Sequence, residues 1–328
     1  MALGATVVAN PLDCLAQPVT RVRRIGILAP GSAGASVVPD FRRVLYGSLG
    51  RAGYEIGRDI FVEWRFAEGK LERLSELADD LVRLNVDVIV AWNDLATEAA
   101  ARATRTIPIV MYAYNEDPVK RGLAASLARP GGNVTGAMWF VDLVNQIVKT
   151  YEVLKLAVPS AVRVASLWSP WIARPKAEEQ VAEIHDRVKR AFGMVVTSFV
   201  VDKSEEIPSA LDRISAFKPD ALFISSTTAI TPRSGEIAAF AIRQKLVLIG
   251  SGPQVVTAGG LLYFGPDRPH VIDRTVSFVD RILRGAKPGD LPIEQPAKFE
   301  LVFNARTARA IGYSPPPELR LRIDRVIE

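Results

Sequence analysis

The sequence has one cysteine and two histidines in 328 residues, and this scarcity narrows the chemistry open to it. A single cysteine, Cys14, excludes a disulfide within the chain. The surroundings of His185 and His270 resemble neither a metal site nor a catalytic triad, and we interpret both as surface residues. We therefore expect no bound metal and no thiol or metal catalysis.

Signatures of common nucleotide-binding and hydrolytic enzymes are also missing. There is no Gly-x4-Gly-Lys-Ser/Thr loop and no Gly-x-Ser-x-Gly elbow, and residues 31–34 do not make a Gly-x-Gly-x-x-Gly fingerprint. No residue stands out as catalytic and no cofactor is implied. The sequence thus predicts a protein that is not an enzyme.

Long apolar runs and clustered charge are absent as well. No run reaches 18 apolar residues, so no segment is predicted to cross a membrane. The net charge of +5 is modest and the arginines are scattered, which argues against a nucleic-acid partner. Residues 1–22 are expected to be a leader. Their apolar piece at 2–9 is typical of the second half of a secretion signal, and a disordered leader without a targeting role is the alternative.

The chain is long enough for two domains, and its two halves repeat a pattern. Three apolar segments recur in the same order after 139, 133 and 138 residues, with chance matching as the alternative. The paired segments are RIGILAP from Arg24 and RVASLWSP from Arg163, NVDVIVAW from Asn85 and KPDALFIS from Lys218, and RTIPIVM from Arg105 and RQKLVLI from Arg243.

Short apolar runs alternate with amphipathic helical segments along both halves. This order predicts an α/β fold, made of two similar doubly wound parallel-sheet lobes joined by a hinge of several strands. The stretch 107–140 passes the chain out of the first lobe. We expect residues 23–136 plus about 256–296 to form the first lobe, and residues 137–255 plus about 297–328 to form the second.

Candidate binding residues follow from the rule that ligands collect beyond the carboxyl ends of parallel strands. Many of these residues precede helices, so simple helix capping is the alternative for each. Ser32 and Thr227 are the favoured candidates for holding a ligand carboxylate at a helix start. The full set is Ser32, Trp92, Asn93, Asp94, Tyr114, Asn115, Trp168, Ser169, Trp171, Ser226, Thr227, Ser251 and Gln254.

Tryptophans are concentrated near these strand ends. Trp92, Trp168 and Trp171 come just after predicted strands, and Trp139 lies in the crossover strand. Several rings at one rim favour stacking on an apolar or aromatic ligand, with core packing as the alternative. Arg174 is a further candidate partner for a carboxylate, unless it is a solvated residue at a helix start.

Several longer motifs point to a known family. They are Asp117-Pro-Val with LARPGGNVTG from Leu127, AGGL from Ala258, YFGPD from Tyr263, RILRGAKP from Arg281 and DLPIEQPAKFELV from Asp290. From about residue 23 to 328 the chain resembles the ABC-transporter substrate-binding proteins of the tryptophan/tyrosine-binding type. The resemblance implies a periplasmic-binding-protein fold, an export signal, and a membrane permease with its ATPase as partners.

Together these observations predict an exported, periplasmic or extracytoplasmic solute-binding protein of an ABC importer, expected to be a monomer. Its ligand is expected to be a small carboxylate with an aromatic or bulky apolar body, bound in the cleft between the lobes. A ligand-sensing module of a receptor or regulator is the alternative. An enzyme on the same scaffold is disfavoured because no base and nucleophile pair is present.

Overall fold

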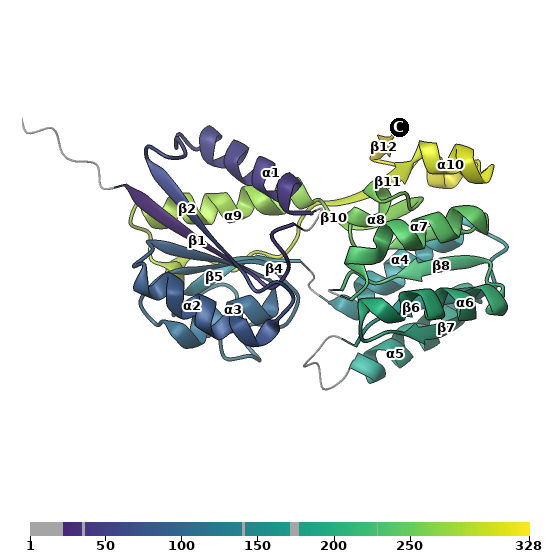
Figure 1. Ribbon diagram of the computed structural model, residues 1–328, viewed down its shortest axis with the longest axis horizontal. Coiled ribbons are helices and arrows are strands. Elements are labelled where there is room, and N and C mark those ends of the chain that lie inside the picture. Colours follow the sequence, from purple (N-terminus) through teal and green to yellow (C-terminus); the bar gives the residue numbers. More distant parts are fainter. Residues whose placement is uncertain (1–21, 35–36, 140–141, 171–176, 228) are drawn as a thin grey trace, which may run out of the picture.

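The computed structural model describes residues 22–34, 37–139, 142–170, 177–227 and 229–328, which form two lobes built around separate sheets (Figure 1). The first sheet has five parallel strands in the order β2-β1-β3-β4-β5. Their bounds are β1 Arg23–Ala29, β2 Ile60–Phe66, β3 Val88–Trp92, β4 Ile109–Tyr114 and β5 Val134–Met138.

Helices cover both faces of this first sheet (Figure 1). Ile25 and Ile27 of β1 pack under one pair of helices, and Leu28 packs under the other pair. A strand buried on both faces has to be apolar throughout, which explains why β1 reads as a continuous apolar run. The helices are α1 Val37–Arg51 and α9 Arg268–Leu283 on one face, and α2 Leu74–Arg83 and α3 Asp94–Ala103 on the other.

The second sheet has seven strands in the order β12-β11-β10-β9-β8-β6-β7. All neighbours are parallel except β10 and β11, which are antiparallel. The bounds are β6 Arg163–Trp168, β7 Val195–Val200, β8 Ala221–Ile224, β9 Val247–Gly250, β10 Leu262–Pro266, β11 Phe299–Asn304 and β12 Arg325–Ile327.

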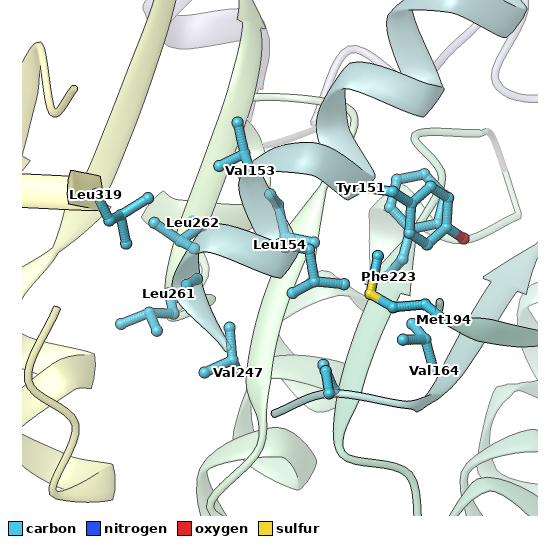
Figure 2. Close-up of a cluster of buried hydrophobic side chains, with 14 of the residues drawn as sticks. Tyr151, Val153, Leu154, Val164, Met194, Phe223, Val247, Leu261, Leu262 and Leu319 are labelled. Atoms are coloured by element: carbon cyan, nitrogen blue, oxygen red, sulfur yellow. The ribbon is translucent and has the colours of Figure 1, made fainter. Parts of the chain in front are cut away.

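The second lobe also has a core on each face of its sheet. On one face, Tyr151 and Leu154 of α4 lie over the strands beside Val164 and Phe223, as Figure 2 shows, and the rings of Tyr151 and Phe223 are 5.1 Å apart. The helices of this lobe are α4 Leu143–Ala157, α5 Ala177–Phe192, α6 Ile207–Phe217, α7 Ser234–Arg243, α8 Gln254–Thr257, α10 Ala305–Ile311 and α11 Pro317–Arg320.

A shared local geometry marks the two lobes as repeats. Asp87, just before β3, accepts a hydrogen bond from the backbone nitrogen of Arg24 at 2.8 Å. Asp220, just before β8, accepts one from the backbone nitrogen of Arg163 at 2.7 Å. Two residues before each aspartate the backbone is left-handed, with φ of 50° at Asn85 and 51° at Lys218. The prediction of two similar α/β lobes is therefore confirmed.

Three crossings of the chain join the lobes. They run from β5 to α4, from β10 to α9, and from Glu294 to β11. The backbone nitrogen of Met138 donates to the carbonyl of Glu294 at 2.8 Å, and Lys298 forms a 2.7 Å ion pair with Asp267. The hinge thus consists of several segments that hydrogen-bond or pair with one another.

The expected lobe boundary near residue 256 differs from the observed one. β10 pairs with β9 and lies in the second sheet, so the chain returns to the first lobe only at α9. The physical reason is that β10 extends the parallel order of the second sheet by one strand.

α8, α11 and β12, each four residues or fewer, were not predicted. In the described part of the chain no helix is long and apolar enough to cross a membrane.

Candidate functional site

The carboxyl ends of the parallel strands β1 to β5 and β6 to β10 lie toward the crossings between the lobes, whereas β11 and β12 run the opposite way. β5 ends where the chain leaves the first lobe, and β10 ends where it returns to that lobe. Because neighbouring strands on each side are parallel, their carboxyl ends share these edges. We call residues following β1, β3 and β4 the first rim, and residues following β6, β8, β9 and β10 the second rim.

Asp94 organises the first rim. It is the first residue of α3, and only 9% of it is exposed. Its Oδ1 accepts hydrogen bonds from the backbone nitrogens of Asn115 at 2.8 Å and Glu116 at 3.0 Å, and its Oδ2 accepts one from Asn115 Nδ2 at 2.9 Å. The structure therefore brings the predicted residues Asp94 and Asn115 together, and the pair fixes the loop after β4.

Two other first-rim candidates have local partners. Asn93 caps α3, because its Oδ1 accepts from the backbone nitrogen of Ala96 at 3.2 Å. The hydroxyl of Ser32 is hydrogen-bonded to the carboxylate of Glu68, and this bond lowers the pKa of Glu68. A ligand carboxylate at Ser32 would thus meet a competing anion. For Asn93 the capping alternative is the one observed.

An aromatic cluster lies behind the first rim. Trp92 stacks on Phe41 with ring centroids 4.3 Å apart and meets Tyr112 edge-on at 5.5 Å. Tyr112 is buried, and burial raises its pKa to about 12. Trp92 remains partly exposed. The cluster consists of Phe41, Trp64, Phe66, Trp92, Tyr112 and Trp139.

The second rim contains a polar group in which three predicted residues meet. The backbone nitrogen of Ser226 donates to Ser251 Oγ at 2.9 Å, and Gln254 Nε2 donates to Ser226 Oγ. Gln254 Nε2 also lies 3.3 Å from Thr231 Oγ1. The close approach requires glycine at position 252, because a Cβ there would come within 2.0 Å of Ser226 Oγ.

Two hydroxyls beside this polar group are buried without a hydrogen bond. The hydroxyl oxygens of Ser225 and Thr227 have no hydrogen-bond partner among the described residues. Buried polar atoms are nearly always paired, so two unpaired hydroxyls side by side at this edge are unusual. Thr227 was a favoured candidate. Ser225 was missed because the strand was expected to include it, whereas β8 ends at Ile224.

Trp168 and Ser169 are mainly part of the core of the second lobe. Trp168 is 8% exposed and its indole nitrogen donates to Ser198 Oγ at 2.9 Å, and Ser169 is 6% exposed. Trp168 therefore packs as the core alternative predicts. Trp171 and Arg174, and the side chain of Tyr114, lie outside the described residues.

Arg268 joins the second rim and was missed by the sequence reasoning. It is the first residue of α9, directly beyond the carboxyl end of β10, and its Nη2 donates to Gln254 Oε1 at 3.2 Å. The same strand-end rule that selected the other candidates would have found it. The rule was not applied to β10, because the segment beyond Ser251 has no counterpart in the sequence repeat.

Comparison with known proteins now assigns the chain to a family. A family model described as ABC transporter substrate binding protein matches residues 41–326. The chain belongs to this family.

Relatives of this substrate-binding protein agree with that assignment. A tyrosine-binding protein of Clostridioides difficile is 27% identical over 259 residues, which cover 79% of this chain and 72% of that protein. A conserved domain protein of Vibrio cholerae has 24% identity, a TM-score of 0.79, and coverage of 94% of this chain and 100% of its own. The ABC domain from Streptococcus pneumonia in complex with L-Trp has 23% identity, a TM-score of 0.78, and coverage of 93% and 100%. The two structures show the shared fold.

Both histidines of the substrate-binding protein, expected to be surface residues, are partly exposed. His185 on α5 is half-buried, and burial lowers its pKa. The backbone nitrogen of His270 donates to Asp267 Oδ1 at 3.0 Å in the cap of α9. The described residues contain no group of three histidine, cysteine, aspartate or glutamate side chains that could hold a metal ion.

Proposed function

We propose that this protein is the extracytoplasmic solute-binding component of an ABC importer. Its ligand is a small carboxylate with an aromatic or bulky apolar body, either an amino acid or an aromatic acid, bound between the two rims. The observation that carries this proposal is the pairing of an aromatic cluster behind the first rim with unpartnered hydroxyls, Ser225 and Thr227, at the second. The aromatic cluster suits an apolar body, and the hydroxyls suit an anion.

Relatives support the same ligand class. Names of similar proteins include a tyrosine-binding protein and a structure with L-Trp. A more distant solute-binding protein from R. palustris, with a TM-score of 0.53, was solved with benzoate. These ligands share a carboxylate on an aromatic body. The partners proposed for this chain are a membrane permease and its ATPase, and the proposed state is a monomer.

Binding and closure are coupled in this proposal. The first rim captures the apolar body beside Trp92. The second rim adds hydrogen bonds that form only when the lobes approach each other, and these added bonds determine how much of the closed state is populated. A permease would then recognise the closed form.

Thermal unfolding of the purified protein with a panel of solutes tests the ligand class. The panel is L-tyrosine, L-tryptophan, benzoate and 3,4-dihydroxybenzoate, with L-lysine and glucose as controls. At 100-fold excess over the dissociation constant, a bound ligand stabilises by about 2.7 kcal/mol, which raises the melting temperature by roughly 5 °C or more. Failure of every apolar carboxylate to raise it would contradict the proposed ligand class.

A paired set of variants tests the role of the first rim. Trp92→Ala removes the partly exposed ring and should weaken the binding of the aromatic acid by about tenfold, since aromatic stacking contributes around 1 kcal/mol beyond its buried area. Phe61→Ala is the control, because Phe61 is 46% exposed on β2 and lies outside the aromatic cluster. Equal affinities of both variants would argue against the first rim.

A further inference from the structure

Arg268 has a place in the fold that the other rim residues lack. It belongs to α9, which packs against the first sheet together with α1, yet its guanidinium donates to Gln254 of the second lobe at 3.2 Å. Gln254 in turn donates to Ser226 Oγ. Arg268 is therefore connected to both lobes and lies at the edge of the second-rim polar group.

The charge of Arg268 is not balanced locally. In the part of the chain that the structure describes, no salt bridge joins Arg268 to a carboxylate. The neighbouring carboxylate, Asp267, is already occupied by Lys298 at 2.7 Å and by the backbone nitrogen of His270. A partly buried arginine without an anion retains most of its hydrogen-bonding capacity, since its guanidinium has five N–H donors and only one is used here.

The helix that Arg268 begins packs against the aromatic cluster. Burial raises the pKa of Tyr112 to about 12, and the nearby positive charge of Arg268 opposes this rise. Burial likewise raises the pKa of Tyr263 of β10, again opposed by Arg268. Tyr112 also packs in one core cluster with Val271, in the first turn of α9. The ring of Tyr112 in turn meets Trp92 edge-on at 5.5 Å. The start of α9 thus brings a positive charge to the same end of the helix that packs on the aromatic cluster.

We propose that Arg268 is the specificity-determining residue that binds the ligand carboxylate, held in position by Gln254. This inference rests on the proposed function and adds the group that separates acids from neutral aromatic molecules. Arginine suits the task because its planar fork matches the two oxygens of a carboxylate. Since Arg268 moves with the first lobe and is bonded to the second, binding the anion there also favours the closed arrangement of the lobes.

Isothermal titration of two matched probe pairs tests the assignment. The pairs are benzoate with benzamide and L-tryptophan with L-tryptophanamide, in which only the carboxylate is replaced. For wild type we expect preference for the acid. Arg268→Gln should weaken acid binding by about tenfold or more and amide binding by less than about threefold, because a charge-assisted hydrogen bond is lost only for the acid.

Two further variants make the result specific. Arg281→Gln removes an exposed arginine near the other end of α9 and should leave the acid-to-amide ratio unchanged. Arg268→Lys keeps the charge but loses the planar fork, so its ratio should fall between those of wild type and Arg268→Gln. If Arg268→Gln does not fold, Arg268→Lys alone tests the proposal.

The possible failures are distinguishable. A wild type that binds the acids while Arg268→Gln and Arg268→Lys keep the wild-type ratio would overturn the role of Arg268 and leave the proposed function standing. A wild type that binds acid and amide equally would likewise overturn it. Absence of binding to either acid by wild type would contradict the proposed function and this inference together.

Discussion

Asp94 and Gln254 each hold their surroundings through several hydrogen bonds. Asp94 fixes the loop after β4, and Gln254 joins Ser226, Thr231 and Arg268. Residues of these types at strand ends therefore shape the rims before any ligand arrives. At the scale of the single residue, the residue type alone does not show whether a side chain binds a ligand or supports the fold, because the same oxygen atoms can do either.

Replacing Asp94 should destabilise the first lobe. Asp94→Ala leaves the backbone nitrogens of Asn115 and Glu116 without their acceptor in a part-buried loop. The expected loss in unfolding free energy is about 3 kcal/mol, since each such donor costs about 1–3 kcal/mol. Urea unfolding followed by tryptophan fluorescence measures it. Asp79→Ala, at an exposed position on α2, is the control and should change little. Similar stability of the two variants would contradict this role.

The sequence predicted which residues lie at the rims, but not which partners each side chain has. The strand-end rule placed Ser226, Ser251 and Gln254 at one site, and the structure shows them hydrogen-bonded to one another. It could not show that Ser32 already holds Glu68, because that contact joins residues 36 positions apart. It also missed Arg268, whose position depends on which sheet β10 joins. Such contacts depend on tertiary packing, which no local pattern encodes.

At the scale of the element, the aspartates that precede β3 and β8 connect each lobe's strands. Asp220 accepts hydrogen bonds from the backbone nitrogens of Val162 and Arg163 at 2.8 and 2.7 Å. Asp87 makes the corresponding bond to Arg24 in the first lobe. The two aspartates occur at equivalent places in the repeated sequence segments. The two lobes therefore share a specific hydrogen bond as well as an apolar pattern.

The pH dependence of stability tests this role of Asp220. Hydrogen bonds from the backbone of Arg163 lower the pKa of Asp220 below its ordinary value in the folded protein. A depressed folded pKa means that the stabilisation is complete above the unfolded pKa of about 3.9 and is lost as pH falls through the folded value. Asp220→Asn should therefore be less stable than wild type at pH 7, and the difference should shrink below about pH 4.

Chemical denaturation at several pH values provides the measurement. Asp212→Asn on the neighbouring helix α6 is the matched control, because Asp212 is exposed, and it should follow wild type throughout. A stability difference for Asp220→Asn that stays constant from pH 7 to 3 would show that its charge is not involved.

The bounds of several helices and strands could be predicted from the sequence. The apolar patterns predict elements at 23–29, 60–66, 163–168, 207–217 and 299–304. These are the observed bounds of β1, β2, β6, α6 and β11. These are segments in which burial on one or two faces determines the pattern. The short elements α8, α11 and β12 were not predicted, because three or four residues are too few to show a period. The lobe boundary was misplaced for a related reason, since a strand's pattern does not say which sheet it joins.

At the scale of the whole molecule, the rims of the two lobes lie on the sides where the chain crosses. The hinge consists of three segments, and Arg268, Gln254 and the Lys298–Asp267 ion pair lie at or beside it. A ligand that touches both rims would therefore bear directly on the segments that have to bend. Under the proposed function, a solute bound there would control the arrangement of the lobes, as in hinge-bending proteins generally.

The most direct measurement is a crystal structure of the protein grown with whichever acid of the panel raises its melting temperature most. We predict that the acid lies between the rims, with its apolar body within about 5 Å of the Trp92 ring and its carboxylate bonded to the second rim beside Thr227. An acid bound on an outer face of either lobe, or with its body away from Trp92, would contradict binding between the rims.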